Sequence, residues 1–333
     1  LILVAFIYAM YQLISRQETY EKKSVVFIFL IFVLGILLAA VQLGPGWELW
    51  QLSLRSGDPT AAAFNYGLNP LKNLVLFFAP DFYGNPATGN FWGWGAYNES
   101  ASYVSIAGLF LAVIALFGSL ENKTLFFFKG LLVFSLLMVF TNPFSNFIYS
   151  LRLPILASSS AGRFLFLVDF SLAVLAAFGI ESIVTQKKIQ RYFILVLFAV
   201  LFLIIAIIVF IKPDLWPDQN LLANLAVVRR NLILPTFMLL VSLVLISVAS
   251  LTKAAPLKKI FLWFLLPLVV FDLFRFGFKY TPFTNKSYLY PETQLTNFLK
   301  DQEGLYRFTG LIPQSMFIPY NLSSPEGYEP LMI

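Results

Sequence analysis

Apolar residues fill long uninterrupted runs along this chain, and polar residues gather in the stretches between them. A helix that crosses the hydrocarbon core of a bilayer needs about 20 consecutive apolar residues, whereas strands show a short alternating pattern. The runs of suitable length lie at 1–15, 24–43, 103–120, 125–141, 163–184, 192–211, 231–251 and 260–278. The pattern therefore predicts an all-α polytopic integral membrane protein with about eight transmembrane helices. The chain starts at Leu1 inside an apolar run, without Met or a signal peptide, which indicates an internal fragment of a longer protein.

These runs divide the chain into four parts. We expect two transmembrane helices in 1–43, a loop in 44–102, six transmembrane helices in 103–280 and the start of an extracytoplasmic domain in 281–333. In the last part, 291–300 reads as a short helix and 306–311 as a strand.

The loop 44–102 is too long and too aromatic to be a simple connection. Loops beyond about 15 residues are usually functional or disordered, and its many Trp, Tyr and Phe residues argue against disorder. Within it, 47–54 and the stretch after Asn69-Pro70 predict short interfacial helices, and 83–98 predicts an irregular segment held by its aromatic side chains. We interpret the loop as a folded cap over the outer mouth of a helical bundle.

Lys and Arg residues fall unevenly between the two sets of connections. The turns at 16–23, 121–129, 185–191 and 252–259 carry 11 Lys or Arg in 32 residues, whereas the other connections carry 12 in 159. Cytoplasmic loops of membrane proteins are enriched in these residues, so the short basic turns are predicted to be cytoplasmic. The loop 44–102 and the C-terminal tail then lie on the other, outer side of the membrane.

The composition agrees with a membrane protein and excludes several chemistries. Apolar residues make up 59% of the chain and charged residues only 12%. Cys and His are absent, which excludes disulfides, thiolate or imidazole metal sites and Ser-His-Asp or Cys-His catalysis. The net charge of +6 is explained by the basic turns, so no nucleic acid partner is expected.

Several short motifs follow one another in a fixed order: VQLGP at 41–45, LSLR at 52–55, PDFYG at 80–84, YNE at 97–99, GRFL at 162–165, LAAFGI at 175–180 and GYEPL at 327–331. In this order the motifs resemble the bacterial YfhO family of membrane proteins. The chain departs from the family pattern at 158–161, where a further basic residue and Pro are expected, and at Glu329, where Asp is more usual.

This resemblance implies a function at the outer face of the membrane. The family resembles the GT-C class of polytopic glycosyltransferases, which take a sugar from a polyprenyl-phosphate-linked donor. YfhO-type members are associated with glycosylation of cell-envelope polymers such as lipoteichoic acid, so the implied partners are membrane lipids, this donor and such an acceptor. In GT-C enzymes the catalytic carboxylate lies in the first outer loop, which here would precede Leu1, so the catalytic residue is unknown.

The chemistry of glycosyl transfer also selects residues of this chain. A carboxylate takes the proton of the acceptor hydroxyl, and a cation or metal ion stabilises the leaving phosphate. Glu99 and Asp81 lie among aromatic residues and are our candidates for the acceptor or metal side. No cofactor and no metal-ligand motif is identified, although this chemistry accommodates a divalent cation. A solvated loop carboxylate or a turn cap is the structural alternative for each residue.

Three arginines are candidates for binding the lipid phosphate. Arg163 stands at the outer end of a predicted span, with Arg55 and Arg152 in outer loops. Arg binds phosphate with two parallel hydrogen bonds, but it also extends toward lipid headgroups at many helix ends.

Three more polar residues, Asp169, Asp272 and Arg275, lie within predicted spans, where ionisable groups are rare and often functional. Asp169 is expected to pair with Arg163 or Arg152, and Asp272 with Arg275 on the same helical face.

Two functions outside the enzymes remain open. A lipid or glycan flippase or transporter predicts polar residues that continue through the bundle, whereas those seen here gather near the outer ends. A non-catalytic envelope scaffold predicts loops without converging carboxylates and arginines, and the sequence separates it least from the enzyme.

Overall fold

Most of the residues that the structure describes are helical. The computed structural model describes residues 2–15, 22–52, 67–118, 122–151, 153, 156, 160–185, 202, 204–252, 254–281, 283, 285–302, 304, 307–308 and 318–323. Among these residues, β-structure is limited to two isolated bridges, Asn69 with Phe140 and Arg307 with Ser323. The chain divides into two compact units, one made of Leu1–Phe32 and Thr60–Thr281 and the other of Val33–Pro59 and Pro282–Ile333.

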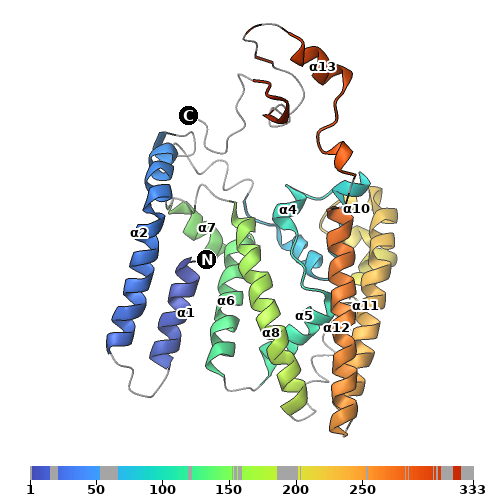
Figure 1. The fold of residues 1–333 in the computed structure, drawn as a ribbon. Helices are drawn as coiled ribbons and strands as arrows, with labels where there is room; N and C mark the ends of the chain where they lie inside the picture. Colours follow the sequence, from blue (N-terminus) through green and yellow to red (C-terminus); the bar gives the residue numbers. More distant parts are fainter. Residues whose placement is uncertain are drawn as a thin grey trace. The chain divides into compact units, whose positions relative to one another are not determined.

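Long apolar helices occur singly or in consecutive pairs, and short helices lie between them along the chain (Figure 1). The long helices are α1 (Ile2–Ser15), α2 (Lys22–Leu52), α5 (Ile106–Phe117), α6 (Lys123–Val139), α8 (Leu165–Thr185), α11 (Leu225–Leu251) and α12 (Ala255–Tyr280). The short α-helices are α4 (Tyr97–Ser100), α7 (Pro143–Ser150), α10 (Asn220–Ala223) and α13 (Gln294–Lys300). The 3-10 helices are η2 (Leu71–Phe77), η3 (Pro86–Thr88), η4 (Ala161–Phe164), η5 (Pro213–Leu215), η6 (Lys286–Tyr288) and η8 (Ile318–Tyr320).

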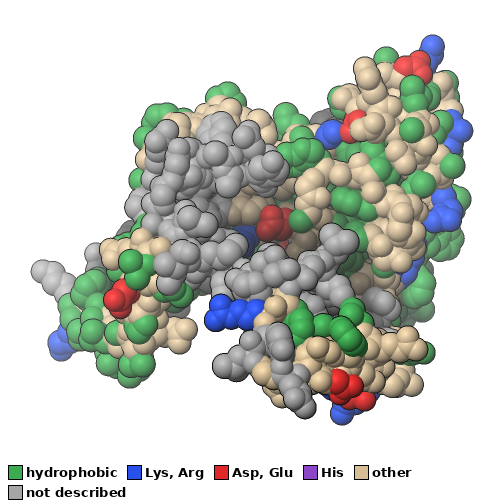
Figure 2. All heavy atoms as spheres, turned by 90° about the horizontal axis from the view of Figure 1, so that it is seen from above, with side chains coloured by type: hydrophobic (Ala, Val, Ile, Leu, Met, Phe, Trp, Pro, Cys, Tyr) green, Lys and Arg blue, Asp and Glu red, His purple; other side chains and the backbone are tan. Residues whose placement is uncertain are grey.

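Four helices are long and apolar enough to cross a membrane. They are Val25–Leu52, Ala161–Thr185, Leu225–Ala249 and Pro256–Tyr280. Large apolar side chains of these helices are exposed, such as Phe27 at 65% and Trp263 at 69%, which is stable in lipid but not in water. Figure 2 shows the molecule from above, where the charged side chains that can be seen lie scattered among apolar and other ones. The chain is therefore of the all-α membrane type.

The predicted count of eight spans is not reached among the described residues. Helices occur at seven of the eight predicted positions, but α1 has 14 residues, α5 has 12 and α6 has 17. The remaining prediction, 192–211, lies largely outside the described residues. The run predicted to start at Tyr103 begins its helix only at Ile106, because Ser105 adopts a positive φ of 64° and caps α5 by accepting a hydrogen bond from the Gly108 amide.

The core of the larger unit is centred on α5, whose side chains are buried on almost all sides. An α-helix that is apolar all round belongs in the middle of a bundle. Its main neighbour is α8, and the two backbones meet at Gly179, where a Cβ atom would lie 2.0 Å from the Leu111 carbonyl oxygen. Only a glycine permits this approach. Helix α6 also packs against α8.

The cap predicted within 44–102 is partly described, from 67 onward. A 3-10 helix, η2, starts after Pro70 as the Asn69-Pro70 pair predicts, and the run ends before Pro80. Asn69 itself does not cap η2, since its backbone bridges to α6 through hydrogen bonds with Val139 and Thr141, both within 3.0 Å. The predicted irregular segment follows, with only η3 and α4 in it.

Two boundaries differ from the prediction. Helix α2 does not end at 43 but continues through Pro45 to Leu52, so the separate interfacial helix predicted at 47–54 is its last turns as far as it is described. Pro45 removes one backbone hydrogen bond, a local effect that apolar flanking turns tolerate. Helix α7 was not predicted, although Asn142 before Pro143 repeats the signal recognised at Asn69 and forms a capping box.

The C-terminal part contains the predicted short helix but no described strand. Helix α13 begins after Thr293, whose side chain forms a capping box with Thr296. Of the predicted strand at 306–311, the described residues contribute only the bridge of Arg307 to Ser323. The Tyr320 hydroxyl donates a hydrogen bond of 2.8 Å to the Pro291 carbonyl, which folds the tail back on itself.

Candidate functional site

Asp81 is buried at the centre of the cap, with only 5% of its surface exposed. One carboxylate oxygen, Oδ1, accepts hydrogen bonds from Asn85 Nδ2 at 2.8 Å and from the Tyr97 hydroxyl at 3.0 Å. The other oxygen, Oδ2, forms an ion pair with Lys279 Nζ at 2.7 Å. Both oxygens of this carboxylate are therefore engaged by groups of the chain itself.

The same turn is joined to the two long helices α11 and α12. The Asp81 carbonyl oxygen accepts a hydrogen bond of 2.6 Å from Asn231 Nδ2 of α11. The ring of Tyr97 stacks on Tyr280 of α12, with 5.0 Å between the ring centroids. Burial raises the pKa of Tyr97, and the adjacent Asp81 charge raises it further, so the hydroxyl stays protonated and donates. We call the group of Asp81, Asn85, Tyr97, Asn231 and Lys279 the cap latch.

The geometry of the cap latch is that of a group that stabilises the structure by holding the cap to α11 and α12. A general base must accept a proton from a bound hydroxyl, but here each oxygen already accepts from a donor within the chain. The prediction that Asp81 serves the acceptor or metal side is not tested by this arrangement and would require the ion pair to open. Lys279 was missed from sequence, because a lysine at the end of an apolar helix is usually a headgroup contact.

A second ion pair fastens the other side of the cap, between Lys72 of η2 and Asp218 next to α10. The Tyr83 hydroxyl donates a hydrogen bond of 3.1 Å to the Lys72 carbonyl, and Phe82 lies against Trp216 with 4.8 Å between ring centroids. The hydrogen bond from Lys72 holds the pKa of Asp218 below its ordinary value.

Glu99 and Arg163, distant in sequence, lie on neighbouring segments. Glu99 is on α4 and half-buried, and Arg163 is on η4 and exposed. A Cβ atom on Gly162 would lie 2.2 Å from the Glu99 carbonyl oxygen, so α4 and η4 meet backbone to backbone. The Gly162 amide also donates a hydrogen bond of 3.1 Å to the Gly67 carbonyl. The absence of a side chain at Gly162 thus lets the segment that carries the predicted carboxylate contact the segment that carries the predicted phosphate-binding arginine.

Two intramembrane carboxylates are held by consecutive residues. The Ser102 hydroxyl donates to Asp169 of α8, and the Tyr103 hydroxyl donates a hydrogen bond of 2.7 Å to Asp272 of α12. The same Asp272 oxygen accepts from the Ile106 amide at 3.2 Å, at the first turn of α5. Successive side chains of an extended segment point to opposite sides, which explains how neighbours reach two different helices.

The predicted partners of these carboxylates were different. We expected Asp272 to pair with Arg275 and Asp169 with Arg163 or Arg152, but neither carboxylate is in an ion pair between described residues. The prediction missed the hydroxyl donors, since it considered partners on the same helix or in the basic loops. Arg55 and Arg152 lie outside the described residues. Across the described ranges, no group of three or more acidic side chains is arranged to hold a metal ion.

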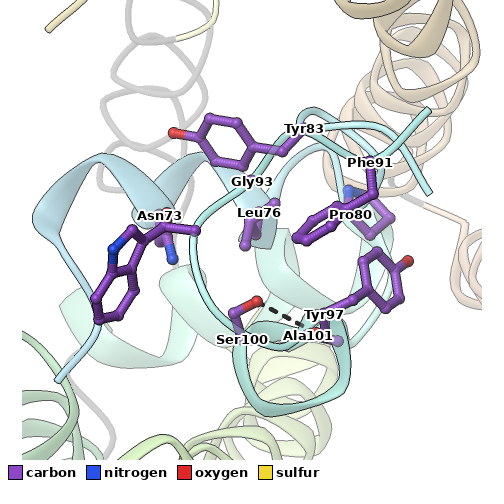
Figure 3. A pocket seen from close by; sticks show the side chains of 10 residues that line it. Asn73, Leu76, Pro80, Tyr83, Phe91, Gly93, Tyr97, Ser100 and Ala101 are labelled. Atoms are coloured by element: carbon purple, nitrogen blue, oxygen red, sulfur yellow. Dashed lines mark hydrogen bonds between the residues drawn. The ribbon is translucent and has the colours of Figure 1, made fainter. Parts of the chain in front are cut away.

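A small pocket lies beside α4 in the cap, with a volume of about 10 Å³. Its walls are Asn73, Leu76, Pro80, Tyr83, Phe91, Gly93, Trp94, Tyr97, Ser100 and Ala101. Figure 3 shows Asn73 on one side of the pocket and Phe91 and Tyr97 on the opposite side. Four of the walls are aromatic, as the sequence indicated for this segment.

Comparison of the chain with models of protein families, with curated proteins and with solved structures finds no match. The function therefore has to be argued from the site itself.

Proposed function

We propose that the chain is part of a polytopic membrane glycosyltransferase of the YfhO type, with a GT-C-like arrangement. It would transfer a sugar from a polyprenyl-phosphate-linked donor to an extracytoplasmic cell-envelope acceptor, lipoteichoic acid being an example. The observation that carries the proposal is the backbone contact of α4 and η4 at Gly162, which joins the segments of Glu99 and Arg163, together with the aromatic pocket that α4 also lines.

The two side chains supply complementary parts of the reaction. An acceptor oxygen attacks the anomeric carbon of the sugar, and the bond from that carbon to the phosphate oxygen breaks. The electron pair leaves with the phosphate, where the Arg163 guanidinium binds the developing negative charge. On the acceptor side, the Glu99 carboxylate accepts a hydrogen bond from the attacking hydroxyl, whose proton passes to the catalytic carboxylate that the GT-C resemblance implies.

The proposed sidedness places this chemistry at the outer face. The basic turns between helices are assigned to the cytoplasm, so the cap and its two ion pairs face outward. Four apolar helices support a membrane location for such a cap. A lipid-linked donor reaches this site within the outer leaflet, with its phosphate at headgroup depth.

Release of polyprenyl phosphate tests the proposal. The protein is reconstituted in liposomes with a labelled polyprenyl-phosphate sugar, and release is followed after addition of envelope acceptor. We expect acceptor-dependent release, lowered about 100-fold or more by Glu99→Gln and by Arg163→Gln. Asp214→Asn and Arg230→Gln are matched controls, because both residues are exposed and lie outside α4 and η4.

The outcomes separate the proposal from its alternatives. Unchanged release in both variants at normal expression removes these residues from the mechanism. Tight donor binding without release favours a flippase or a binding protein. If the protein neither releases polyprenyl phosphate nor binds the donor, an envelope scaffold is favoured. The engagement of both Asp81 carboxylate oxygens within the chain also supports that role.

A further inference from the structure

Asn73, one of the residues that line the aromatic pocket, has a buried hydrogen-bonding atom without a partner among the described residues. Asn73 has 3% of its surface exposed, and its Nδ2 donates a hydrogen bond of 3.0 Å to Asn69 Oδ1. Its own Oδ1 is buried and accepts no hydrogen bond from the part of the chain that the structure describes. Leaving such an acceptor unsatisfied costs about 1–3 kcal/mol, so a donor from outside the chain is favoured here.

Asn73 cannot easily turn away to find another donor. It lies within η2, and its partner Asn69 is fixed by the backbone bridge to Phe140 beside α6. The Tyr83 hydroxyl, another polar group of the pocket residues, already donates to the Lys72 carbonyl. The Ser100 hydroxyl is likewise directed to carbonyl oxygens of its own helical turn, at 3.2 and 3.3 Å. Asn73 Oδ1 therefore stays without a hydrogen-bond donor from these neighbouring groups.

The dimensions of the pocket specify the donor. A volume of about 10 Å³ admits one water-sized group, such as a single hydroxyl. Trp94 lines the pocket and is 43% exposed, so part of its ring is open to a ligand outside. A pyranose ring has an apolar C–H face that packs on an indole while one of its hydroxyls points sideways.

We propose that this pocket is a carbohydrate subsite, in which a pyranose packs on Trp94 and places one hydroxyl against Asn73 Oδ1. The proposal rests on the glycosyl-transfer function proposed above and specifies where a sugar is held. The link is α4, which supplies Tyr97 and Ser100 to the pocket and carries Glu99 between them. A buried acceptor of this kind selects a hydroxyl donor, because an analogue that lacks the hydroxyl leaves the acceptor unpaired.

Equilibrium binding of free sugars tests the subsite. The protein is placed in lipid nanodiscs, without glycoside detergents, and saturation-transfer NMR measures the binding of the methyl glycosides of glucose, galactose and N-acetylglucosamine. Glycerol serves as a polyol that has no ring. We expect at least one glycoside to bind, with affinity lowered at least tenfold by Trp94→Ala and by Asn73→Leu.

The control variants are chosen among exposed residues outside the pocket. Trp263→Ala and Asn98→Leu change residues of the same types that are exposed outside the pocket, and binding is expected to be unchanged. The subsite is refuted if no glycoside binds, or if binding is equal in Trp94→Ala and the unsubstituted protein, which would leave water alone as the donor to Asn73. If Asn73→Leu fails to fold, Trp94→Ala decides, since that side chain is largely exposed.

This experiment is independent of turnover. Sugar binding that depends on Trp94, in a protein without transfer activity, retains the subsite and removes the transferase. Normal transfer in Trp94→Ala removes the subsite and retains the transferase.

Discussion

Replacing Lys279 by methionine should loosen the cap without unfolding the helices. The change leaves the Asp81 carboxylate, whose side chain is 6% exposed, without its cation. Removing one partner of a buried ion pair typically costs 3–5 kcal/mol. Lys279 is 23% exposed and Asp81 keeps its donors Asn85 and Tyr97, so we expect about 2–3 kcal/mol here.

Replacing the other partner of the ion pair should destabilise the cap less. Asp81→Asn leaves a lysine side chain that can extend toward water, so its cost should be about 1 kcal/mol. The double variant Asp81→Asn with Lys279→Met removes both charges and should be closer in stability to the original than Lys279→Met alone. The coupling energy of the pair is the cost of the double variant minus the summed costs of the two single variants.

Amide hydrogen exchange of the cap, residues 79–92, measures this effect. A cost of 2–3 kcal/mol corresponds to about a 30- to 160-fold faster exchange of these amides, with the amides of α8 unchanged. Lys300→Met is the control, because the pair of Lys300 and Glu292 is exposed, at 36% and 69%, and such pairs contribute little. Exchange in Lys279→Met no faster than in the control, or additive effects in the double variant, would contradict the cap latch.

Two further predictions concern packing and pH. Gly179→Ala should destabilise the protein by about 1–3 kcal/mol in thermal unfolding, because the new Cβ lies 2.0 Å from the Leu111 carbonyl oxygen. Gly130→Ala on α6, where nothing lies within 4 Å, should be neutral or stabilising. The pKa of Asp218 is lowered by Lys72, so this pair stabilises the cap fully above the unfolded carboxyl pKa of about 3.9 and is lost as the pH falls through the lower folded pKa. The protection of the amides of 212–224, measured relative to their intrinsic exchange rate at each pH, should therefore fall in acid, and Asp218→Asn should abolish that acid-dependent fall.

The local signals in the sequence placed several elements correctly. Pro70 marks the start of η2, because a fixed proline φ acts within one helical turn. The helix predicted at 291–300 is α13, which begins at Gln294 after the Thr293 cap. The same signal at Asn142 was present and unused, so α7 was predictable. At Pro45 the local rule failed, since the apolar turns on both sides maintain α2 across one lost hydrogen bond.

The partners in the candidate site depended on long-range contacts. Sequence analysis selected Asp81, Asp169 and Asp272 for their charge, but it assigned them sugar, metal or arginine partners. Their donors are Lys279, Ser102 and Tyr103, each on a segment distant in sequence. No periodicity or spacing encodes such pairs, because they arise only when the helices pack.

The sequence by itself indicated a helical membrane protein. Long apolar runs with few charges form helices in lipid, because each backbone group there must be hydrogen-bonded within its own segment. The sequence also determined the aromatic character of the cap. Only the tertiary structure decided which groups meet. Gly179 lies against the backbone carbonyl of Leu111, and Gly162 lies against that of Glu99. A missing Cβ permits close approach, but which backbone fills the space is set by the packing of the whole bundle.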